Sequence, residues 1–292
     1  MPDFPPRLKK ALLGSSFAVM LGSSAALLWP PFAAGSEAIP NFAPDSTVGW
    51  LKPPGDEFIQ PESGPGPVKA DPAHPYFSNA IAAQETVKIA DLTNPILQPW
   101  VVAQMKKSND EVMAGKVVGF TARSRCWPHG VPGFLLYPVH PIFIIQTEKE
   151  VLMTWGQDFQ LRRIYLNQPH SKNVKPSWYG ESVGHYENGD TLVVDTIGLN
   201  DKTYIDNYRT PHTTQLHVIE RFKIVDNGSA LEVRVRVEDP GAFTMPWNAV
   251  QRYKRDSRDG EVPLHEMVCA ENNSDHFAQG LVPIPQADKP DF

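Results

Sequence analysis

Short runs of alternating apolar and polar residues follow one another through the second half of the chain, with the period of two that is typical of β-strands. The turn sequences Asn188-Gly189-Asp190 and Asp226-Asn227-Gly228 separate neighbouring runs and predict tight hairpins. No helical crossover of a dozen residues interrupts the runs, so we expect a mainly β fold whose strands are antiparallel and close into a barrel. The predicted strands are Phe134 to Tyr137, Ile142 to Gln146, Val151 to Trp155, Leu161 to Leu166, Ser182 to Glu187, Thr191 to Ile197, His217 to Val225, Leu231 to Glu238, Ala249 to Lys254 and Leu264 to Cys269.

Alternation also assigns side chains to the two faces of each predicted strand. In the run that starts at Leu216, His217 and Ile219 face one way, whereas Val218 and Glu220 face the other. His217 and Glu220 are therefore not expected to enter one cavity, and Glu220 is expected to pair with an arginine.

Asp195 lies in an otherwise apolar strand, on the face opposite to Val194. A carboxylate in such a strand needs a partner, because an unpaired buried charge is costly. Asp195 is therefore either half of a structural ion pair or a functional acid. The available partners are Arg162, Arg163, His170, His185 and His212.

Ahead of the strands, residues Ile96 to Ala114 show helical periodicity and predict one N-terminal amphipathic helix, with Asn94 as its N-cap and Pro95 at its first position. Residues 39–93 are rich in proline and predict an extended arm, either disordered or laid across the domain surface. The expected organisation is a signal peptide (1–38), this arm (39–93), a helix-plus-barrel domain (94–276) and a C-terminal tail (277–292).

The first residues are typical of an export signal. The basic run Arg7-Leu8-Lys9-Lys10 precedes a nearly charge-free apolar stretch from Ala11 to Ala34. Small residues favour cleavage after Gly35 or Ala38, and the Pro30-Pro31 pair disfavours a membrane-spanning helix. We therefore expect a periplasmic or secreted protein with no membrane span after signal removal.

Composition narrows the classes of partner. The 292 residues include 41% hydrophobic and 21% charged residues, which is ordinary for a globular protein with a sizeable core. The formal net charge of −6 argues against nucleic acid as a partner, because binding to phosphate backbones depends on a positive surface. The composition leaves the oligomeric state open.

Export also decides how the two cysteines are interpreted. Cys126 and Cys269 are the only cysteines, and an oxidising compartment allows such a pair to persist as a disulfide. Two cysteines without Cys-x-x-Cys spacing do not form a thiolate zinc site. We expect a disulfide between them, with separate reduced thiols as the alternative.

The run Gly180-Glu181-Ser182-Val183-Gly184 matches the nucleophile elbow of serine hydrolases. That motif needs a strand, a sharp turn and then a helix, whereas the residues after Ser182 lead into the Asn188-Gly189-Asp190 turn and another strand. A hairpin leaves no room for the helix, so a serine hydrolase is disfavoured.

If the protein is an enzyme, its polar residues favour acid/base chemistry of the hydratase, lyase or isomerase type, without a diffusible cofactor. We expect Asp195 and His212 to form the proton-transfer pair and Arg163 to stabilise an anion or carbonyl group. The residues predicted to contact a substrate are Trp178, His170, His185, Ser182, Tyr204 and His217.

The order of segments resembles a large family of exported bacterial proteins. The matching segments are Cys126-Trp-Pro-His-Gly-Val-Pro, Trp178-Tyr-Gly-Glu-Ser-Val-Gly, Gly189-Asp-Thr-Leu-Val-Val-Asp-Thr, Pro211-His-Thr, Leu216-His-Val-Ile-Glu-Arg-Phe, Asp239-Pro and Pro246-Trp. The resemblance implies that His170, Trp178, Ser182, Asp195, His212, His217, Glu220 and Arg221 lie in signature segments. The strand number and glycine-containing hairpins are also similar to those of lipocalin-like barrels, by analogy of architecture alone.

Because barrels of this size can enclose one ligand, the leading hypothesis is a barrel that holds a small, largely apolar molecule in its interior. One alternative is a metal-dependent enzyme that uses His212 and His217 with a further His170, His185 or Asp195. Another is a structural or envelope-interaction protein that makes its contacts through the proline-rich arm.

Overall fold

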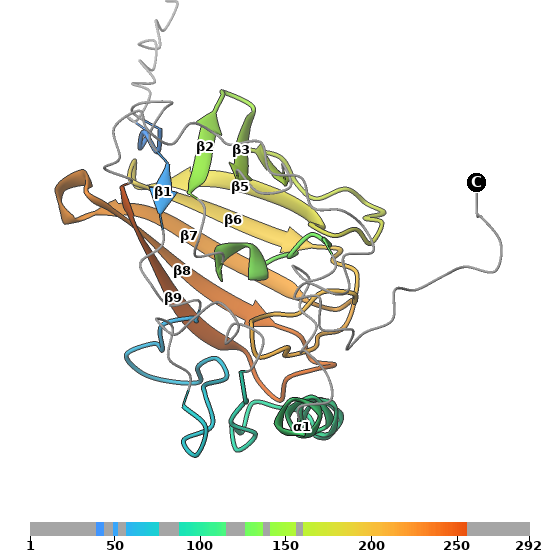
Figure 1. Cartoon of the computed structure of the whole chain (residues 1–292). Coiled ribbons are helices and arrows are strands. Elements are labelled where there is room, and N and C mark those ends of the chain that lie inside the picture. Colours follow the sequence, from blue (N-terminus) through green and yellow to red (C-terminus); the bar gives the residue numbers. More distant parts are fainter. Residues whose placement is uncertain are drawn as a thin grey trace, which may run out of the picture. The chain divides into compact units, whose positions relative to one another are not determined.

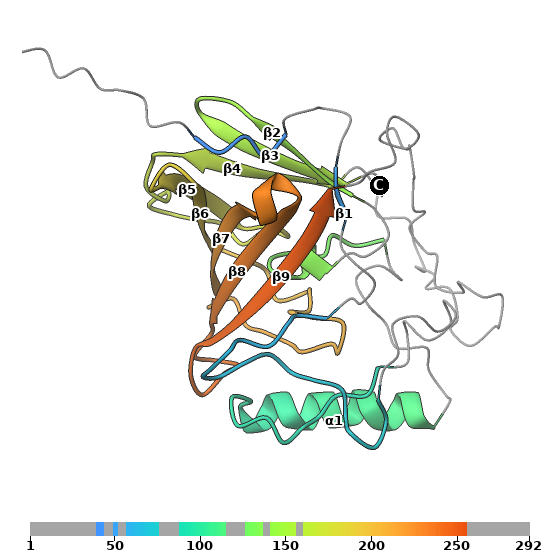
Figure 2. The same ribbon diagram turned by 90° about the vertical axis from the view of Figure 1, so that its left-hand side faces the viewer.

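A closed β-barrel with one α-helix beside it is seen in a computed structural model of the protein (Figure 1 and Figure 2). The structure describes residues 39–43, 49–51, 57–75, 88–114, 126–136, 141–155 and 160–255. The predicted signal peptide, the predicted last strand and the C-terminal tail lie outside these ranges. Cys269 lies outside them too, so its disulfide with Cys126 stays a prediction.

Nine strands form the barrel, and each pairs with the next along the chain. β1 closes the ring by pairing with both β2 and β9. The bounds are β1 (Trp50–Leu51), β2 (Ile142–Gln146), β3 (Glu150–Trp155), β4 (Leu161–Leu166), β5 (Glu181–Glu187), β6 (Thr191–Ile197), β7 (His217–Val225), β8 (Ala230–Glu238) and β9 (Trp247–Arg255). The expected mainly β fold and its closure into a barrel are confirmed.

One pair of neighbouring strands departs from the expected antiparallel order. β4 and β5 run parallel, with Ile164 opposite Ser182. The intervening residues 167–180 return the chain along the barrel before β5 begins, and parallel neighbours require a long connection of this kind. The prediction of a wholly antiparallel barrel is therefore wrong, because an irregular connection does here what a helical crossover does elsewhere.

β1 comes from the segment that the sequence assigns to an extended arm. Trp50 pairs with Ile142 of β2 and Arg255 of β9. The side chains of Phe42 and Phe58, from the same segment, are also buried. Part of the arm is thus built into the barrel wall and core, whereas Glu62 and Ser63 of the same segment are exposed on the surface.

The described helix is α1 (Pro99–Met113). The sequence predicts its start at Ile96, but Gln98 is extended (φ −67°, ψ 151°), since the residue before a proline avoids the helical region. The helix lies next to the connection between β8 and β9, where the Trp100 indole N–H donates to the Gly241 carbonyl at 2.7 Å (Figure 2). No helix in the described ranges is long and apolar enough to cross a membrane.

The predicted strand from Phe134 to Tyr137 is wrong, because its described residues belong to the 3-10 turn η3 (Gly133–Leu136). The Phe134 ring stacks on Trp155, an inward-facing residue of β3, with the ring centroids 3.8 Å apart. The Tyr253 hydroxyl of β9 donates to the carbonyl of the residue after Phe134 at 2.6 Å. The turn therefore fills space between inward-facing side chains.

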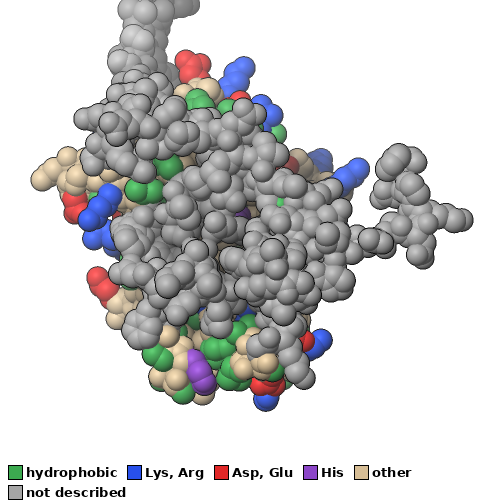
Figure 3. Space-filling view, in the orientation of Figure 1, with side chains coloured by type: hydrophobic (Ala, Val, Ile, Leu, Met, Phe, Trp, Pro, Cys, Tyr) green, Lys and Arg blue, Asp and Glu red, His purple; other side chains and the backbone are tan. Residues whose placement is uncertain are grey.

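The predicted alternation of faces holds along the long strands. Val233 and Val235 of β8 are buried, whereas Arg234 and Arg236 between and beside them are exposed. Charged side chains of both signs are interspersed on the part of the described surface that Figure 3 shows. Along these strands the barrel thus has a mostly apolar inner face and a charged outer face.

Candidate functional site

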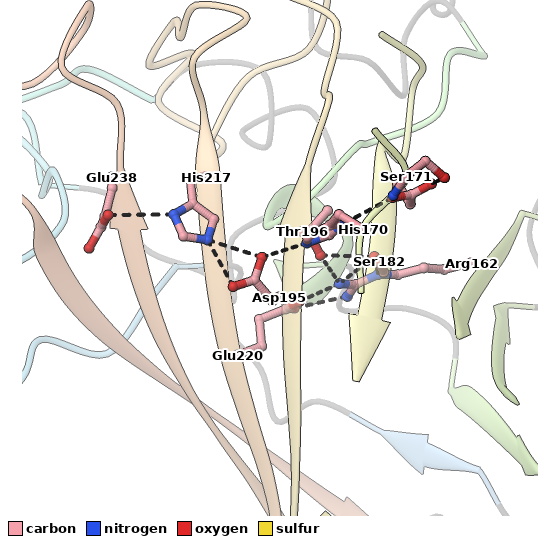
Figure 4. Close-up of polar contacts among 10 residues, drawn as sticks. Arg162, His170, Ser171, Ser182, Asp195, Thr196, His217, Glu220 and Glu238 are labelled. Carbon is pink, nitrogen blue, oxygen red and sulfur yellow. Dashed lines mark hydrogen bonds and ion pairs between the residues drawn. The ribbon is translucent and has the colours of Figure 1, made fainter. Parts of the chain in front are cut away.

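A row of ionisable side chains crosses the outer face of the barrel, with Asp195 of β6 at its centre (Figure 4). The Asp195 Oδ1 atom lies 2.8 Å from His170 Nε2 and 3.1 Å from His217 Nε2. His217 begins β7, whereas His170 belongs to the connection between β4 and β5. The structure therefore brings together three of the residues that the sequence selects.

Each of the two histidines turns its second ring nitrogen toward a glutamate. His170 Nδ1 lies 3.0 Å from Glu181 Oε1, and His217 Nδ1 lies 3.5 Å from Glu238 Oε2. Glu181 also accepts hydrogen bonds from the backbone N–H and the hydroxyl of Ser171, at 2.7 and 2.6 Å. We call this row the histidine–carboxylate chain, and its members are Glu181, His170, Asp195, His217 and Glu238.

Strand register explains why these side chains meet. His217 pairs directly with Glu238 across β7 and β8, so both side chains leave the sheet on the same face. Asp195 pairs with Ile219, which places the Asp195 carboxylate one diagonal step from His217. The outward positions of β6, β7 and β8 thus bring together Asp195, His217 and Glu238, three of the five members of the histidine–carboxylate chain.

Electrostatic contacts favour the charged forms of Asp195 and His217. The hydrogen bond with Asp195 raises the pKa of the His217 imidazole, against the opposing effect of partial burial. The same bond is the main reason that the pKa of Asp195 is lowered. Because both ring nitrogens of His217 face carboxylate oxygens, only the imidazolium form can donate to both.

The His217→Gln substitution is expected to lower the free energy of unfolding by about 1–2 kcal/mol near pH 6, because charge-assisted hydrogen bonds to Asp195 and Glu238 are lost. The folded-state pKa of His217 is raised above its unfolded value of about 6.5. Its stabilisation is therefore fully present below that value and is lost as the pH rises through the folded-state pKa. Urea unfolding of both proteins between about pH 5.5 and pH 9 measures the difference.

A matched control is His74→Gln. His74 forms a similar 2.9 Å pair with Asp71, but the His74 side chain is 47% exposed. We expect little change in stability at any pH, since exposed ion pairs contribute little. A His217 effect that grows as the pH rises would contradict the predicted sign.

Glu220 belongs to a separate ion pair inside the barrel. Arg162 Nη1 donates to Glu220 Oε1 at 2.9 Å, and Arg162 Nη2 bonds the other carboxylate oxygen. Both side chains are 0% exposed. The Thr196 hydroxyl accepts from Arg162 Nη2 at 3.0 Å. The expectations that Glu220 pairs with an arginine and faces away from His217 are confirmed.

Ser182 also faces this interior cluster. Its Oγ atom lies 3.3 Å from Arg162 Nη2 and 2.8 Å from Thr196 Oγ1. β5 and β6 form a hairpin in which Ser182 pairs with Thr196, so the strand–turn–helix geometry of a nucleophile elbow is absent here. The hairpin that argued against a serine hydrolase is confirmed, and Ser182 lies in the core, away from the outer face.

His212 has partners other than Asp195. Its Nε2 atom lies 2.8 Å from Thr203 Oγ1, and its Nδ1 atom lies 3.0 Å from the Thr213 carbonyl oxygen. A carbonyl only accepts, so Nδ1 carries the hydrogen and Nε2 accepts from the Thr203 hydroxyl. Burial lowers the pKa of His212, which favours the neutral ring. The expected proton-transfer pair of Asp195 and His212 is therefore not formed in this structure.

Arg163, the predicted anion stabiliser, points outward from β4. Its Nε atom bonds a carboxylate oxygen of Glu150, and its side chain is 54% exposed. The guanidinium carbon lies 5.1 Å from the centroid of the Tyr165 ring. These contacts engage Arg163 with β3 and β4, and they do not connect it to the histidine–carboxylate chain.

The remaining predicted contact residues are spread over the barrel. The Trp178 ring packs against Trp127 with centroids 5.4 Å apart. The exposed His185 lies 3.1 Å from Glu187, and Tyr204 is half-buried in the connection between β6 and β7. Of the six predicted contact residues, only His170 and His217 join the chain.

Within the described ranges, no group of three or more His, Cys, Asp or Glu side chains is arranged to hold a metal ion. The alternative of a metal-dependent enzyme requires His212 and His217 to bind a metal together. Both ring nitrogens of His212 are instead engaged by Thr203 and Thr213. The metal hypothesis therefore loses the histidine pair on which it rests.

A groove of about 440 Å³ opens beside the histidine–carboxylate chain, on the outer face of β7, β8 and β9. Ile219 and Arg236, which pair across β7 and β8, both line it. Arg236 Nε also donates to Glu238 Oε1 at 2.6 Å, and this contact is the main reason that the pKa of Glu238 is lowered. The Arg236–Glu238 contact thus joins the groove to the histidine–carboxylate chain.

The sequence analysis did not select Glu181 and Glu238, the two glutamates at the ends of the histidine–carboxylate chain. Counting outward from the Asp226-Asn227-Gly228 turn would have placed Glu238 opposite His217. No comparable local signal exists for Glu181, because it meets His170 through the irregular connection before β5.

Comparisons with known proteins do not identify a family for the chain. No protein-family model and no curated protein matches the sequence. The resemblance to exported bacterial proteins therefore stays an expectation, and the function is argued from the side chains of the barrel.

Proposed function

We propose that the protein binds a small organic molecule on the outer face of its barrel and that His217 transfers a proton to it. One observation carries this proposal. The two ring nitrogens of His217 are held unequally, with Nε2 3.1 Å from Asp195 and Nδ1 3.5 Å from Glu238. A substrate atom can displace the looser contact and take its place at Nδ1.

The neighbouring residues have distinct roles in this proposal. Asp195 orients the imidazole and favours its protonated form, which suits a general acid. His170 Nε2 donates to Asp195 Oδ1 at 2.8 Å, an oxygen that His217 also contacts, and keeps that carboxylate in place. Glu181 in turn positions His170. His217 thus acts as the general acid, and His170 and Glu181 are positioning residues.

The elimination of water from a 3-hydroxy acid illustrates the chemistry. His217 Nδ1 gives its proton to the departing hydroxyl, the carbon–oxygen bond breaks, and water leaves. The Glu238 carboxylate, released from Nδ1, takes the proton from the neighbouring carbon as the double bond forms. Transfer of that proton from Glu238 to His217 restores the starting state, so atoms and charge balance. The reverse sequence hydrates a double bond.

Binding inside the barrel has less support than binding outside it. Asp195, His170 and His217 face outward, and the inward positions between them carry buried side chains such as Val194 and Val218. A ligand that uses Asp195, His170 and His217 therefore has to approach from the outer face. An interaction role for the arm also has less support, because Trp50 belongs to the barrel wall and Phe42 and Phe58 are buried.

The proposal predicts turnover that depends on His217. A panel of 3-hydroxy acids and the corresponding 2-enoic acids, followed by proton NMR, tests both directions of the reaction with the full-length protein. We expect His217→Gln and Asp195→Asn to lower the rate by about 10²–10⁴-fold, which is the usual contribution of a general acid. Because the acid must be protonated, the rate is expected to fall as the pH rises through the pKa of His217.

His74→Gln is the control, because it removes a histidine that pairs with a carboxylate elsewhere on the surface. We expect its rate to stay within about twofold of the unaltered protein. If no member of the panel reacts, or if His217→Gln reacts as fast as the unaltered protein, the histidine–carboxylate chain is a structural clamp and the proposed function is wrong.

A further inference from the structure

Three arginines converge on the groove beside the histidine–carboxylate chain. Arg221 of β7 pairs directly with Arg234 of β8, so two positive side chains leave the sheet opposite each other. Arg236 follows on the same face of β8, and all three arginines line the groove. Like charges placed directly opposite each other are unfavourable in a sheet. A bound anion would relieve this repulsion.

The arginines keep donors for a ligand. Each forms one ion pair with a glutamate that does not line the groove. Arg234 and Arg236 use only Nε for these pairs, with Glu232 and Glu238. Their Nη groups have no hydrogen-bond partner among the described residues, and two such groups can bind a carboxylate or phosphate in a bidentate manner. The groove lining itself contains three arginines and one carboxylate, that of Glu62.

The rest of the lining fits the uncharged part of a ligand. Ile219, Val250 and Pro61 supply apolar surface, while Asn248 and Ser63 supply an amide and a hydroxyl group. The volume of about 440 Å³ lies within the usual range for small-molecule sites. Apolar surface beside guanidinium groups favours a molecule with an apolar body and a negatively charged head.

We infer that this groove binds a small organic anion, with its carboxylate or phosphate held by Arg234 and Arg236 and its apolar body on Ile219 and Val250. As the substrate class of the acid–base site, this inference rests on the proposed function. Binding itself is measurable without turnover. The Arg236–Glu238 contact joins the groove to the histidine–carboxylate chain, so an anion on the Nη groups of Arg236 binds next to the glutamate that faces His217 Nδ1.

Calorimetric titration of the full-length protein with benzoate, phenyl phosphate and the neutral analogue benzamide tests the inference. We expect at least one of the two anions to bind at least about tenfold more tightly than benzamide, and added salt to weaken its binding. Arg234→Gln combined with Arg236→Gln is expected to weaken anion binding by at least about tenfold.

The matched control combines Lys223→Gln with Lys254→Gln. It removes the same charge from neighbouring outward positions that do not line the groove. We expect its affinity to stay within about twofold. Equal binding of benzamide, an equal loss in the control, or no binding of either anion would overturn the inference.

The inference and the proposed function can fail separately. His217→Gln is expected to keep anion binding within about threefold, because His217 does not line the groove. Anion binding without turnover of any panel member would reject proton transfer and retain the site. Turnover that depends on His217 but keeps its KM in the Arg234/Arg236 double variant would retain proton transfer and reject the anion site.

Discussion

Glu220→Gln is expected to lower the free energy of unfolding by about 3–5 kcal/mol, because it leaves the Arg162 guanidinium buried without a counter-charge. Both side chains are 0% exposed, so water does not compensate for the lost carboxylate. Thr196 and Ser182 supply only neutral acceptors. Urea unfolding followed by tryptophan fluorescence measures the loss, with an unchanged slope showing that the folded and unfolded states keep their compactness.

Glu150→Gln provides the comparison, because Glu150 pairs with the neighbouring Arg163 on the outer face, where the arginine is 54% exposed. We expect only a small change for this pair. Arg162→Met combined with Glu220→Leu is expected to be more stable than either single variant, since removing both charges leaves neither unpaired. A Glu220→Gln variant as stable as the unaltered protein would mean that Arg162 reaches water or another counter-charge.

Alternation alone predicts the difference between Glu220 and His217. Strand positions of opposite parity face opposite sides, so the sequence places Glu220 and His217 on opposite faces without knowledge of any neighbour. The partner of Glu220 needs more information, because Arg162 reaches it across two intervening strands. The period of two predicts which face of the strand carries Glu220, whereas its contact with Arg162 depends on how the strands close into a barrel.

Two features of the fold are beyond pattern reading for physical reasons. The apolar run around Phe134 is short, and a short apolar run is equally compatible with a strand and a buried turn. The parallel pairing of β4 and β5 depends on the path of residues 167–180, which lack a regular period. His170 lies on that path, and its contact with Asp195 was one of several alternatives left open by the sequence.

In the candidate site, too, the faces of strand residues are predictable from the sequence, whereas the contacts of loop residues are not. The outward placement of Asp195 and His217 is predictable from each strand, and the hairpin count would have added Glu238. His212 was selected for its residue type in a loop, but loop positions have no face assignment, and burial beside Thr203 gives it a different role. Residue type therefore suggested acid/base chemistry, and the strand register determined which of these residues lie close together.

Phe134→Ala is expected to lower the free energy of unfolding by about 3–5 kcal/mol, through lost apolar burial and the cavity left behind. Phe134 is 0% exposed, stacks on Trp155 at 3.8 Å, and lies 5.7 Å from the Arg162 guanidinium carbon. Its ring thus covers both the apolar interior and one side of the buried ion pair. Thermal and urea unfolding measure the loss, with the exposed Ile145→Ala as a control that is expected to change stability by less than about 0.5 kcal/mol.

This variant also tests why the functional site is placed on the outer face. If η3 fills the barrel as Phe134 and its neighbours indicate, truncating the ring opens a void that the surrounding strands relieve only in part. A loss below about 1 kcal/mol would show that the interior adapts easily to a change in volume. A barrel with such an interior could admit a small apolar molecule, whereas a rigid interior favours a ligand site on the outer face, at the histidine–carboxylate chain.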